Sequence, residues 1–174
     1  MTPDEGNFLD EIAIKPLENT STDYMDIFTC CNDLVKLIPD LEREIKDGKI
    51  SGLLAFHDDM CIGAIVATLD VDAALANAHP MPLPCMKILF IEVNSRYRGR
   101  GLGEKLLESF IKKQQEGNIG TIIISLFKNY KQGVRFFKRF GFEKTTGHER
   151  NKILLKLNVW TDFGVVDVDD NDII

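Results

Sequence analysis

The spacing of apolar residues predicts the elements of the first third of the chain. Residues 11–17, EIAIKPL, alternate between apolar and polar side chains and contain Pro16, which is typical of a short edge strand. Residues 22–37 place apolar side chains three and four positions apart, the spacing of one helix face. Pro39 ends this helix and is tolerated in the first turn of a second one, for which Gly48 is a suitable C-terminal cap.

In the middle of the chain the apolar residues no longer follow the helical spacing, which predicts strands there. Residues 50–72 contain two apolar runs around the polar turn HDDM and predict a β-hairpin. Residues 72–87 include three prolines and show no clear period, so we expect a loop. The run KILFIEV, residues 87–93, suits a central strand. An apolar stripe then predicts a helix that ends near Gly117, and GTIIISLF, residues 120–127, predicts another buried strand.

The last elements complete an α/β pattern. YKQGVRFFKRFGF, residues 130–142, predicts a short helix capped by Gly141, and NKILLKLNVW, residues 151–160, predicts the strand that closes the sheet. The expected order is β-α-α-β-β-β-α-β-α-β-β. Because a hairpin precedes the crossover helix, this order predicts an α/β fold with a mixed sheet. We expect one domain over residues 1–160 and an acidic C-terminal tail over residues 161–174.

Composition and charge narrow the class of protein. The chain has 174 residues, of which 44% are apolar and 28% charged, as in an ordinary globular domain. Most of its net charge of −6 lies in the tail, which holds five Asp and no Lys or Arg. A nucleic-acid coat is disfavoured because it needs a broad basic face. No apolar run approaches the roughly 20 residues that span a bilayer, and the acidic N-terminus is unlike a signal peptide.

The four cysteines form no recognisable pattern. Cys30 and Cys31 are adjacent, whereas Cys61 and Cys85 lie far apart. This spacing fits neither a disulfide framework nor a CxxC metal site, and we predict no metal. We expect reduced thiols in a cytoplasmic protein.

The stretch NSRYRGRGLGEKLLESF, residues 94–110, has the composition of an anion site. It follows an apolar strand and opens a helix, whose first N–H groups and dipole attract anions. Glycines permit a tight turn, and Arg98 and Arg100 add positive charge. A Walker A loop is excluded because Gly103 is followed by Glu-Lys, and the glycine spacing is not that of a dinucleotide-binding turn.

Two motifs in this order carry a family resemblance. YRGRGLGEKLL resembles motif A of the GNAT acyltransferase superfamily, with Arg98, Gly101 and Gly103 on its fixed positions. FFKRFGFE, residues 136–143, resembles the end of motif B, and the order of elements from about residue 11 to 160 resembles the GNAT order. The resemblance implies a single domain with a mixed, mostly antiparallel central sheet, flanking helices and a splayed pair of strands at the coenzyme A site.

The resemblance also implies a cofactor and the residues that hold it. Acetyl-CoA is the expected cofactor, and its pantetheine arm is expected to run along the main chain at Ile91 and Val93. Its pyrophosphate is expected on the backbone N–H groups of six consecutive residues, namely Arg98, Gly99, Arg100, Gly101, Leu102 and Gly103.

Transfer of an acetyl group to an amine needs a group that accepts the amine proton. Strand alternation points Ile91 and Val93 into the core and Glu92 to the opposite face, which the resemblance places in the acceptor cleft. Glu92 is therefore the candidate base, its alternative being a solvent-facing glutamate. The tyrosine that the family commonly uses as acid is replaced by Phe137. Tyr130 lies two helical turns earlier on the same face and is the candidate donor, with a packing role equally open.

Several weaker signals remain. His57 and His79 lie in a predicted turn and loop, where a surface histidine is the common case, and Ser125 replaces a glutamate found in some members that acetylate protein N-termini. By resemblance the acceptor binds near residues 24–48 and 72–86. These regions carry the acidic residues Asp23, Asp26, Asp33, Asp40, Glu42 and Glu44, which would suit a cationic amine.

The leading interpretation is an acetyl-CoA-dependent N-acetyltransferase that acts by direct transfer on an amine-bearing small molecule or peptide. One alternative is a non-catalytic acyl-CoA-binding or scaffold module, which Phe137 favours. Another is a nucleic-acid adaptor that uses Arg96, Arg98 and Arg100, which the acidic net charge disfavours. The tail either adds an edge strand to a partner chain in a homodimer or is a disordered acidic end. No nucleic-acid or membrane partner is expected.

Overall fold

A computed structural model describes four stretches of the chain, residues 7–17, 40–70, 84–145 and 150–160. The chain divides into two compact units, residues 1–68 with 89–112 and residues 69–88 with 113–174. The predicted helix at 22–37, most of the predicted loop at 72–87 and the acidic tail lie outside the described residues. No helix in the described stretches is long and apolar enough to cross a membrane.

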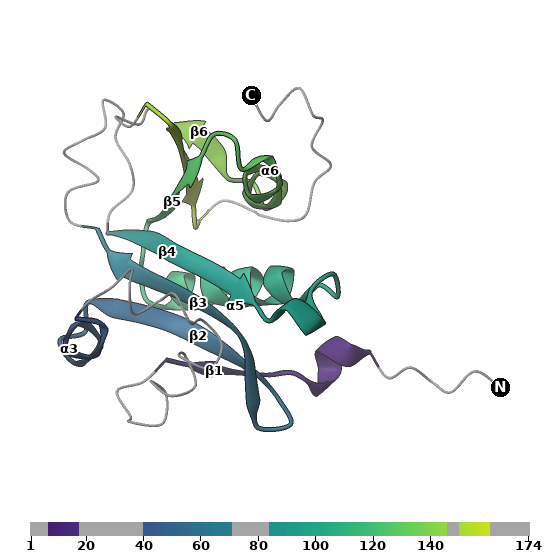
Figure 1. The fold of residues 1–174 in the computed structure, drawn as a ribbon. Helices are drawn as coiled ribbons and strands as arrows, with labels where there is room; N and C mark the ends of the chain where they lie inside the picture. Colours follow the sequence, from purple (N-terminus) through teal and green to yellow (C-terminus); the bar gives the residue numbers. More distant parts are fainter. Residues whose placement is uncertain (1–6, 18–39, 71–83, 146–149, 161–174) are drawn as a thin grey trace. The chain divides into compact units, whose positions relative to one another are not determined.

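The seven strands form one mixed sheet in the order β1-β2-β3-β4-β5-β7-β6 (Figure 1). They are β1 (Ala13–Pro16), β2 (Ile50–His57), β3 (Met60–Leu69), β4 (Cys85–Val93), β5 (Thr121–Phe127), β6 (Glu143–Thr145) and β7 (Lys152–Asn158). The β4–β5 pair is parallel, whereas β1–β2, β2–β3, β5–β7 and β6–β7 are antiparallel. The structure thus confirms an α/β fold with a mixed, mostly antiparallel sheet, and β1 with its Pro16 lies at the sheet edge as predicted.

Local turn chemistry shapes the first unit. The β2–β3 hairpin turns at Asp58 and Asp59, whose φ angles are 48° and 64°. Two consecutive left-handed residues make the kind of two-residue turn that matches strand twist, and Asp tolerates this conformation. Helix α3 (Leu41–Lys46) precedes the hairpin, and Gly48 follows it with a φ of 71°, as a C-terminal glycine does.

Helix α5 (Leu102–Glu116) buries the predicted apolar stripe. The side chains of Leu102, Leu106, Leu107, Phe110 and Ile111 are at most 1% exposed. In the first unit the start of α5 packs closely on β3, because a Cβ placed on Gly63 would lie 3.1 Å from Cδ1 of Leu106. Glycine at this position lets the helix approach the strand.

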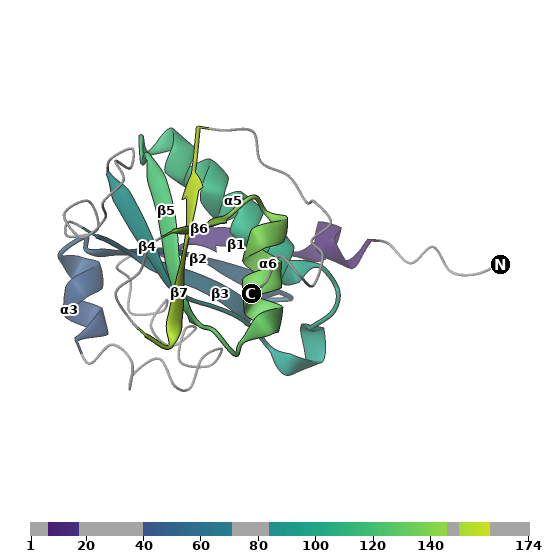
Figure 2. The same cartoon turned by 90° about the horizontal axis from the view of Figure 1, so that it is seen from above.

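The second unit packs helix α6 (Lys131–Arg139) beside β5, β6 and β7 (Figure 2). Its buried face presents Gly133, Val134 and Phe137, and Phe137 contacts Phe142 edge-on. Gly141 follows the helix with a φ of 94°, which confirms its predicted capping role.

The structure corrects the start of β4. The strand begins at Cys85, two residues before the predicted start, so Cys85 and Met86 do not belong to the loop. Both side chains are buried, and the two residues pair with Thr121 and Ile122 of β5. Three nearby prolines favoured a loop, but pairing with a distant strand decides the backbone conformation here.

Two short 3-10 helices are also absent from the predicted order. They are η1 (Phe8–Glu11) and η2 (Ser95–Tyr97). Each follows an asparagine whose side-chain oxygen accepts a hydrogen bond from the backbone N–H two residues later. Leu9 N donates to Asn7, and Arg96 N donates to Asn94. Such turns are too short to leave a periodic apolar pattern.

Candidate functional site

The glycine turn between η2 and α5 exposes a row of backbone donors. Gly99 and Gly101 have φ angles of 77° and 83°, in the left-handed region that favours glycine. The first bond into the helix runs from Lys105 N to Gly101 O, at 3.0 Å. Among the described residues no acceptor is found for the N–H groups of residues 99–103. Left-handed glycines and unpaired N–H groups at the start of a fifteen-residue helix therefore fit a pyrophosphate.

The two arginines of the turn contact the protein itself. Nε of Arg98 donates to the carbonyl oxygen of Val93 at 2.9 Å, which ties the turn back to the end of β4. The guanidinium of Arg100 lies over the ring of Phe8, 5.0 Å from its centroid. Both side chains are exposed, and their contacts tie the turn to the end of β4 and to η1.

Strand β4 leads into the turn, and its first half is the part that pairs with β5. The ladder that β4 forms with β5 covers Cys85 to Ile88 and ends at the pair Ile88–Ile124. The expectation that Ile91 and Val93 lie in the core while Glu92 faces away is only partly right, because all three residues are half-buried. The main chain at Glu92 is closely packed, since its carbonyl oxygen would lie 3.2 Å from a Cβ on Gly63.

The candidate proton donor belongs to the second unit. Tyr130 is the N-cap residue of α6, and its side chain is 56% exposed. Its ring lies against Gly133, where a Cβ would fall 2.5 Å from Cδ1 of the tyrosine. Phe137, at the position where a tyrosine is common in the resembling family, is 2% exposed and packs edge-on against Phe136 and Phe142. Phe137 is thus part of the apolar core of its unit.

The weaker sequence candidates have ordinary surroundings. Ser125 is half-buried and pairs with Leu154 across β5 and β7. Asp40, one of the acidic residues near the expected acceptor region, pairs with Arg43 at 2.8 Å on the surface. His79 lies outside the described residues, and within these residues no group of three or more His, Cys, Asp or Glu is placed to hold a metal.

The two described cysteines are poor nucleophiles. Cys61 and Cys85 are buried, at 3% and 1% exposure, and neither forms a disulfide within the described stretches. Burial raises the pKa of the Cys85 thiol to about 12, and the nearby charge of Asp70 adds to the effect, while Lys87 opposes it. A thiol that keeps its proton at neutral pH does not attack a thioester.

Sequence reasoning missed contacts between the glycine turn and the N-terminal segment. Nζ of Lys105 donates to the carbonyl oxygen of Leu9, 96 residues away in the chain. His57, expected as a surface histidine, is half-buried and pairs with Glu11 at 3.1 Å. No local pattern signals contacts between segments this far apart.

Comparison with known proteins agrees with this geometry. Residues 18–142 match the model of the Acetyltransferase (GNAT) family. A Drosophila melanogaster protein named "Probable N-acetyltransferase san" is 28% identical over 91 residues, 52% of this chain and 45% of that protein. Spermine/spermidine N(1)-acetyltransferase of Bacillus subtilis is 36% identical over 52 residues, 29% of this chain and 34% of that enzyme. The matched region thus spans less than half the length of these curated relatives.

Solved structures share the fold. The PaiA N-acetyltransferase of Thermoplasma acidophilum, crystallised in complex with coenzyme A, superposes with a TM-score of 0.63 at 15% identity. The match covers 84% of this chain and 98% of that one. Enzymes of this family use acetyl-CoA. Because the family model covers most of the chain, including the glycine turn and α6, the chain belongs to the Acetyltransferase (GNAT) family.

Proposed function

We propose that the chain is an N-acetyltransferase that transfers the acetyl group of acetyl-CoA directly to an amine. The observation that carries the proposal is the glycine turn, with two left-handed glycines and the unpaired N–H groups of residues 99–103 at the start of α5, in a chain of this family. In this role the N–H groups bind the pyrophosphate, and the main chain at Ile91 and Val93 bonds the pantetheine arm. Acetyl-CoA supplies the acetyl group as a thioester.

Glu92 is the proposed base. Its position at the end of β4, seven residues before Gly99, would set a carboxylate near the reacting end of a cofactor bound along the strand. The carboxylate accepts the proton that the ammonium group of the acceptor must lose, directly or through a water, before the amine nitrogen bonds the acetyl carbon. The carbon–sulfur bond then breaks, and Tyr130 is proposed to donate the proton that the thiolate takes up. The acylated nitrogen loses its second proton to solvent, and solvent returns a proton to the tyrosine.

Direct transfer is favoured over an acyl-enzyme route. An acyl-enzyme needs an accessible thiolate or another activated nucleophile. The two described cysteines are buried, and Cys85 holds its proton with a pKa of about 12. Of the cysteines that the structure describes, neither is therefore suited to carry an acyl group.

The acceptor is proposed to be an amine-bearing small molecule or a peptide. A polyamine is the first compound to test, because the Bacillus relative is named for spermine and spermidine. The acidic character of the region around α3 supports a cationic acceptor only modestly, since Asp40 already pairs with Arg43.

The test is calorimetric titration with acetyl-CoA and with CoA, on the wild type and on Gly101→Glu. Glutamate at this left-handed position strains the turn and sets a carboxylate against the pyrophosphate, so binding should be lost. Gly117→Glu, at the other end of the same helix, is the matched control and should bind normally. Absence of binding to the wild type would overturn the proposal.

Turnover distinguishes the enzyme from the alternative binding module, which the replacement of the usual tyrosine by Phe137 favours. Thiol release with a panel of amines should be measured for the wild type and for Glu92→Gln. Amine-dependent release that Glu92→Gln lowers by about 10²-fold or more supports the base, the range typical for loss of acid–base catalysis. Cofactor binding without release across the panel would favour the binding module.

A further inference from the structure

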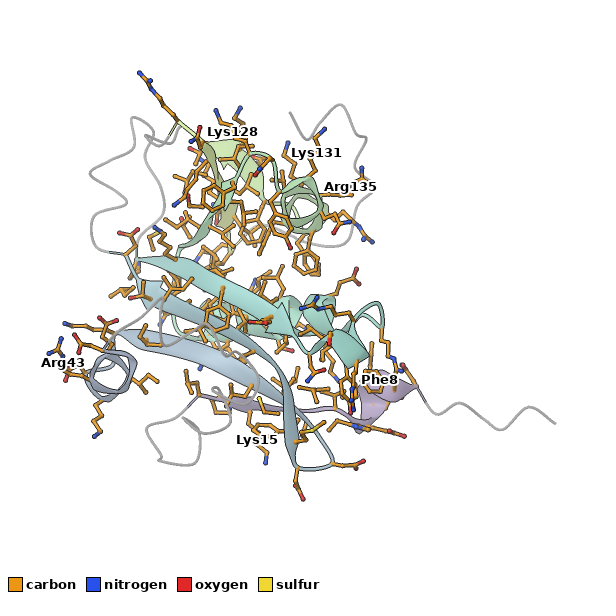
Figure 3. All side chains as sticks on the ribbon, in the orientation of Figure 1. Phe8, Lys15, Arg43, Lys128, Lys131 and Arg135 are labelled. Carbon is orange, nitrogen blue, oxygen red and sulfur yellow. The ribbon has the colours of Figure 1, made fainter. Side chains whose placement is uncertain are left out.

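Three aromatic rings from distant segments meet beside the glycine turn. Phe8 of η1 stacks on Tyr97 of η2 with ring centroids 5.7 Å apart. His57, at the end of β2, lies 5.5 Å from Phe8 and 5.7 Å from Tyr97. All three residues belong to the first unit, and Figure 3 shows Phe8 on η1. Each ring contacts the other two, so the cluster joins η1, η2 and the hairpin.

The segment Asn7–Ile12, called the N-terminal clamp below, also lies against the glycine turn at two positions and against the start of α5 at one. Arg100 lies over the ring of Phe8 at 5.0 Å. Cδ1 of Leu9 would lie 3.4 Å from a Cβ on Gly101. The ammonium group of Lys105, in the first turn of α5, donates to the carbonyl oxygen of Leu9. Two of these positions lie among residues 99–103, whose N–H groups are unpaired, and the third lies two residues after them.

The clamp is itself anchored. Asn7 accepts a hydrogen bond from Leu9 N, and Ile12 N donates back to Leu9 O at 3.3 Å, which closes the short helix. Glu11 pairs with His57 at 3.1 Å, and the side chain of Ile12 is 7% exposed. The internal bonds hold the shape of the segment, and Glu11 and Ile12 attach its C-terminal end to the rest of the first unit.

The turn needs such support because of its glycines. Glycine loses more conformational freedom than any other residue when it is ordered, and Gly99 has no atom of another residue within 4 Å of its Cβ position. Donors that are already fixed bind an anion without the entropic cost of ordering them at that moment. Contacts at Arg100, Gly101 and Lys105 therefore substitute for rigidity that the turn lacks.

We propose that the N-terminal clamp is a positioning element of the pyrophosphate site, which holds the N–H groups of the glycine turn in their binding geometry. The inference rests on the proposed function, since it names what presets the same site. Phe8 is the central positioning residue because it contacts both Arg100 and Tyr97, on the two sides of Gly99. Loss of the clamp weakens recognition of the pyrophosphate and leaves the pantetheine contacts along β4 unchanged.

The test compares two acetyl donors. Acetyl-CoA carries the pyrophosphate, and S-acetylpantetheine lacks it. For Phe8→Ala, the Kd of CoA should rise by about 10-fold, the cost of reordering a few residues. The value of kcat/KM should fall by a similar factor with acetyl-CoA and stay constant with S-acetylpantetheine. Lys105→Met, which removes the bond to Leu9 and keeps the aliphatic stem, should act in the same direction if Phe8→Ala folds poorly.

Lys15→Ala is the matched control. Lys15 lies over the ring of Phe56 at 4.9 Å, so the variant removes a cation–π contact of the same kind in the same unit but outside the clamp (Figure 3). Its Kd for CoA should equal that of the wild type. A merely structural role for Phe8 would lower the activity with both donors equally, and this result would overturn the inference.

The two proposals fail in different ways. Wild type that binds no CoA refutes the acetyltransferase function and with it the clamp. Wild type that binds CoA, together with Phe8→Ala and Lys105→Met that bind it equally well, refutes the clamp alone.

Discussion

Substitution of Gly133 by alanine tests whether Tyr130 donates a proton. The ring of Tyr130 lies against Gly133, and a Cβ there would be 2.5 Å from Cδ1 and 3.1 Å from Cζ of the tyrosine. Ordinary contact between such atoms begins near 3.5 Å, so the ring must move by about 1 Å. Because the side chain is 56% exposed, it can move outward without disturbing the core. Alanine also favours the helix over glycine by about 0.8–1 kcal/mol, so the variant should unfold at a temperature close to that of the wild type.

The expected effect on catalysis follows from this displacement. A misplacement of about 1 Å can cost about 10²-fold in rate. Loss of a general acid costs about 10²–10⁴-fold, and the low end applies here because a thiolate with a pKa of about 8.5 leaves readily. If Tyr130 is the donor, Gly133→Ala and Tyr130→Phe should each lower kcat by about 10²-fold, with the Kd of CoA unchanged.

Steady-state thiol release, calorimetry and thermal unfolding on the two variants decide the question. Gly117→Ala, another glycine-to-alanine change, is the control, because its Cβ would be in ordinary contact at 3.5 Å with the carbonyl oxygen of Lys113. Full activity of Tyr130→Phe would refute the donor role and leave Tyr130 with its packing role on Gly133. Activity lost in Gly133→Ala alone would indicate a steric effect on the site.

Three further predictions concern stability. Gly63→Ala forces its Cβ against Glu92 O at 3.2 Å and Leu106 at 3.1 Å, and should lower the free energy of unfolding by about 1–3 kcal/mol in urea titrations; an unchanged midpoint would contradict the close packing. The raised pKa of Cys85 stabilises the protein below about pH 8.5, and this contribution declines as the pH rises towards 12 by at most about 1.4 kcal/mol per unit. Cys85→Ala should therefore show a flatter loss of stability between pH 7.5 and 9.5, and an identical slope would refute the effect. Gln114 is 3% exposed, and its Nε2 has no acceptor in the described part of the chain, so Gln114→Met should raise the melting temperature, through a gain of about 1 kcal/mol.

The elements that sequence reasoning predicted well are those that local chemistry determines. The stripe of α5 is buried as its spacing requires, and Gly48 and Gly141 adopt the left-handed conformation expected after helices. The predicted start of β4 was wrong because Cys85 and Met86 follow a proline-rich stretch, while their pairing partners lie 36 residues further along the chain. A window of neighbouring residues contains no information about such a partner.

In the candidate site, too, the local backbone could be predicted and the long-range contacts could not. Glycines indicated a turn of unusual backbone, and Gly99 and Gly101 have it. The contacts of Arg98 and Arg100 could not be predicted from the sequence. Arg98 donates to Val93 O, and Arg100 lies over the ring of Phe8, 92 positions away in the chain. Positive charge beside a turn of this kind suggests direct contact with a ligand, whereas the structure shows that both side chains contact the protein itself.

These contacts bear on how the site would achieve selectivity. Backbone N–H groups bind a pyrophosphate only when several point at it together, and the glycines that permit this geometry do not enforce it. In the proposed site, side chains would enforce it, since Arg98 bonds the end of β4 and Arg100 lies over the ring of Phe8. Arg98→Lys keeps the charge but loses the planar group whose Nε reaches Val93 O. If position matters more than charge, this conservative change should weaken CoA binding as much as Arg98→Gln does.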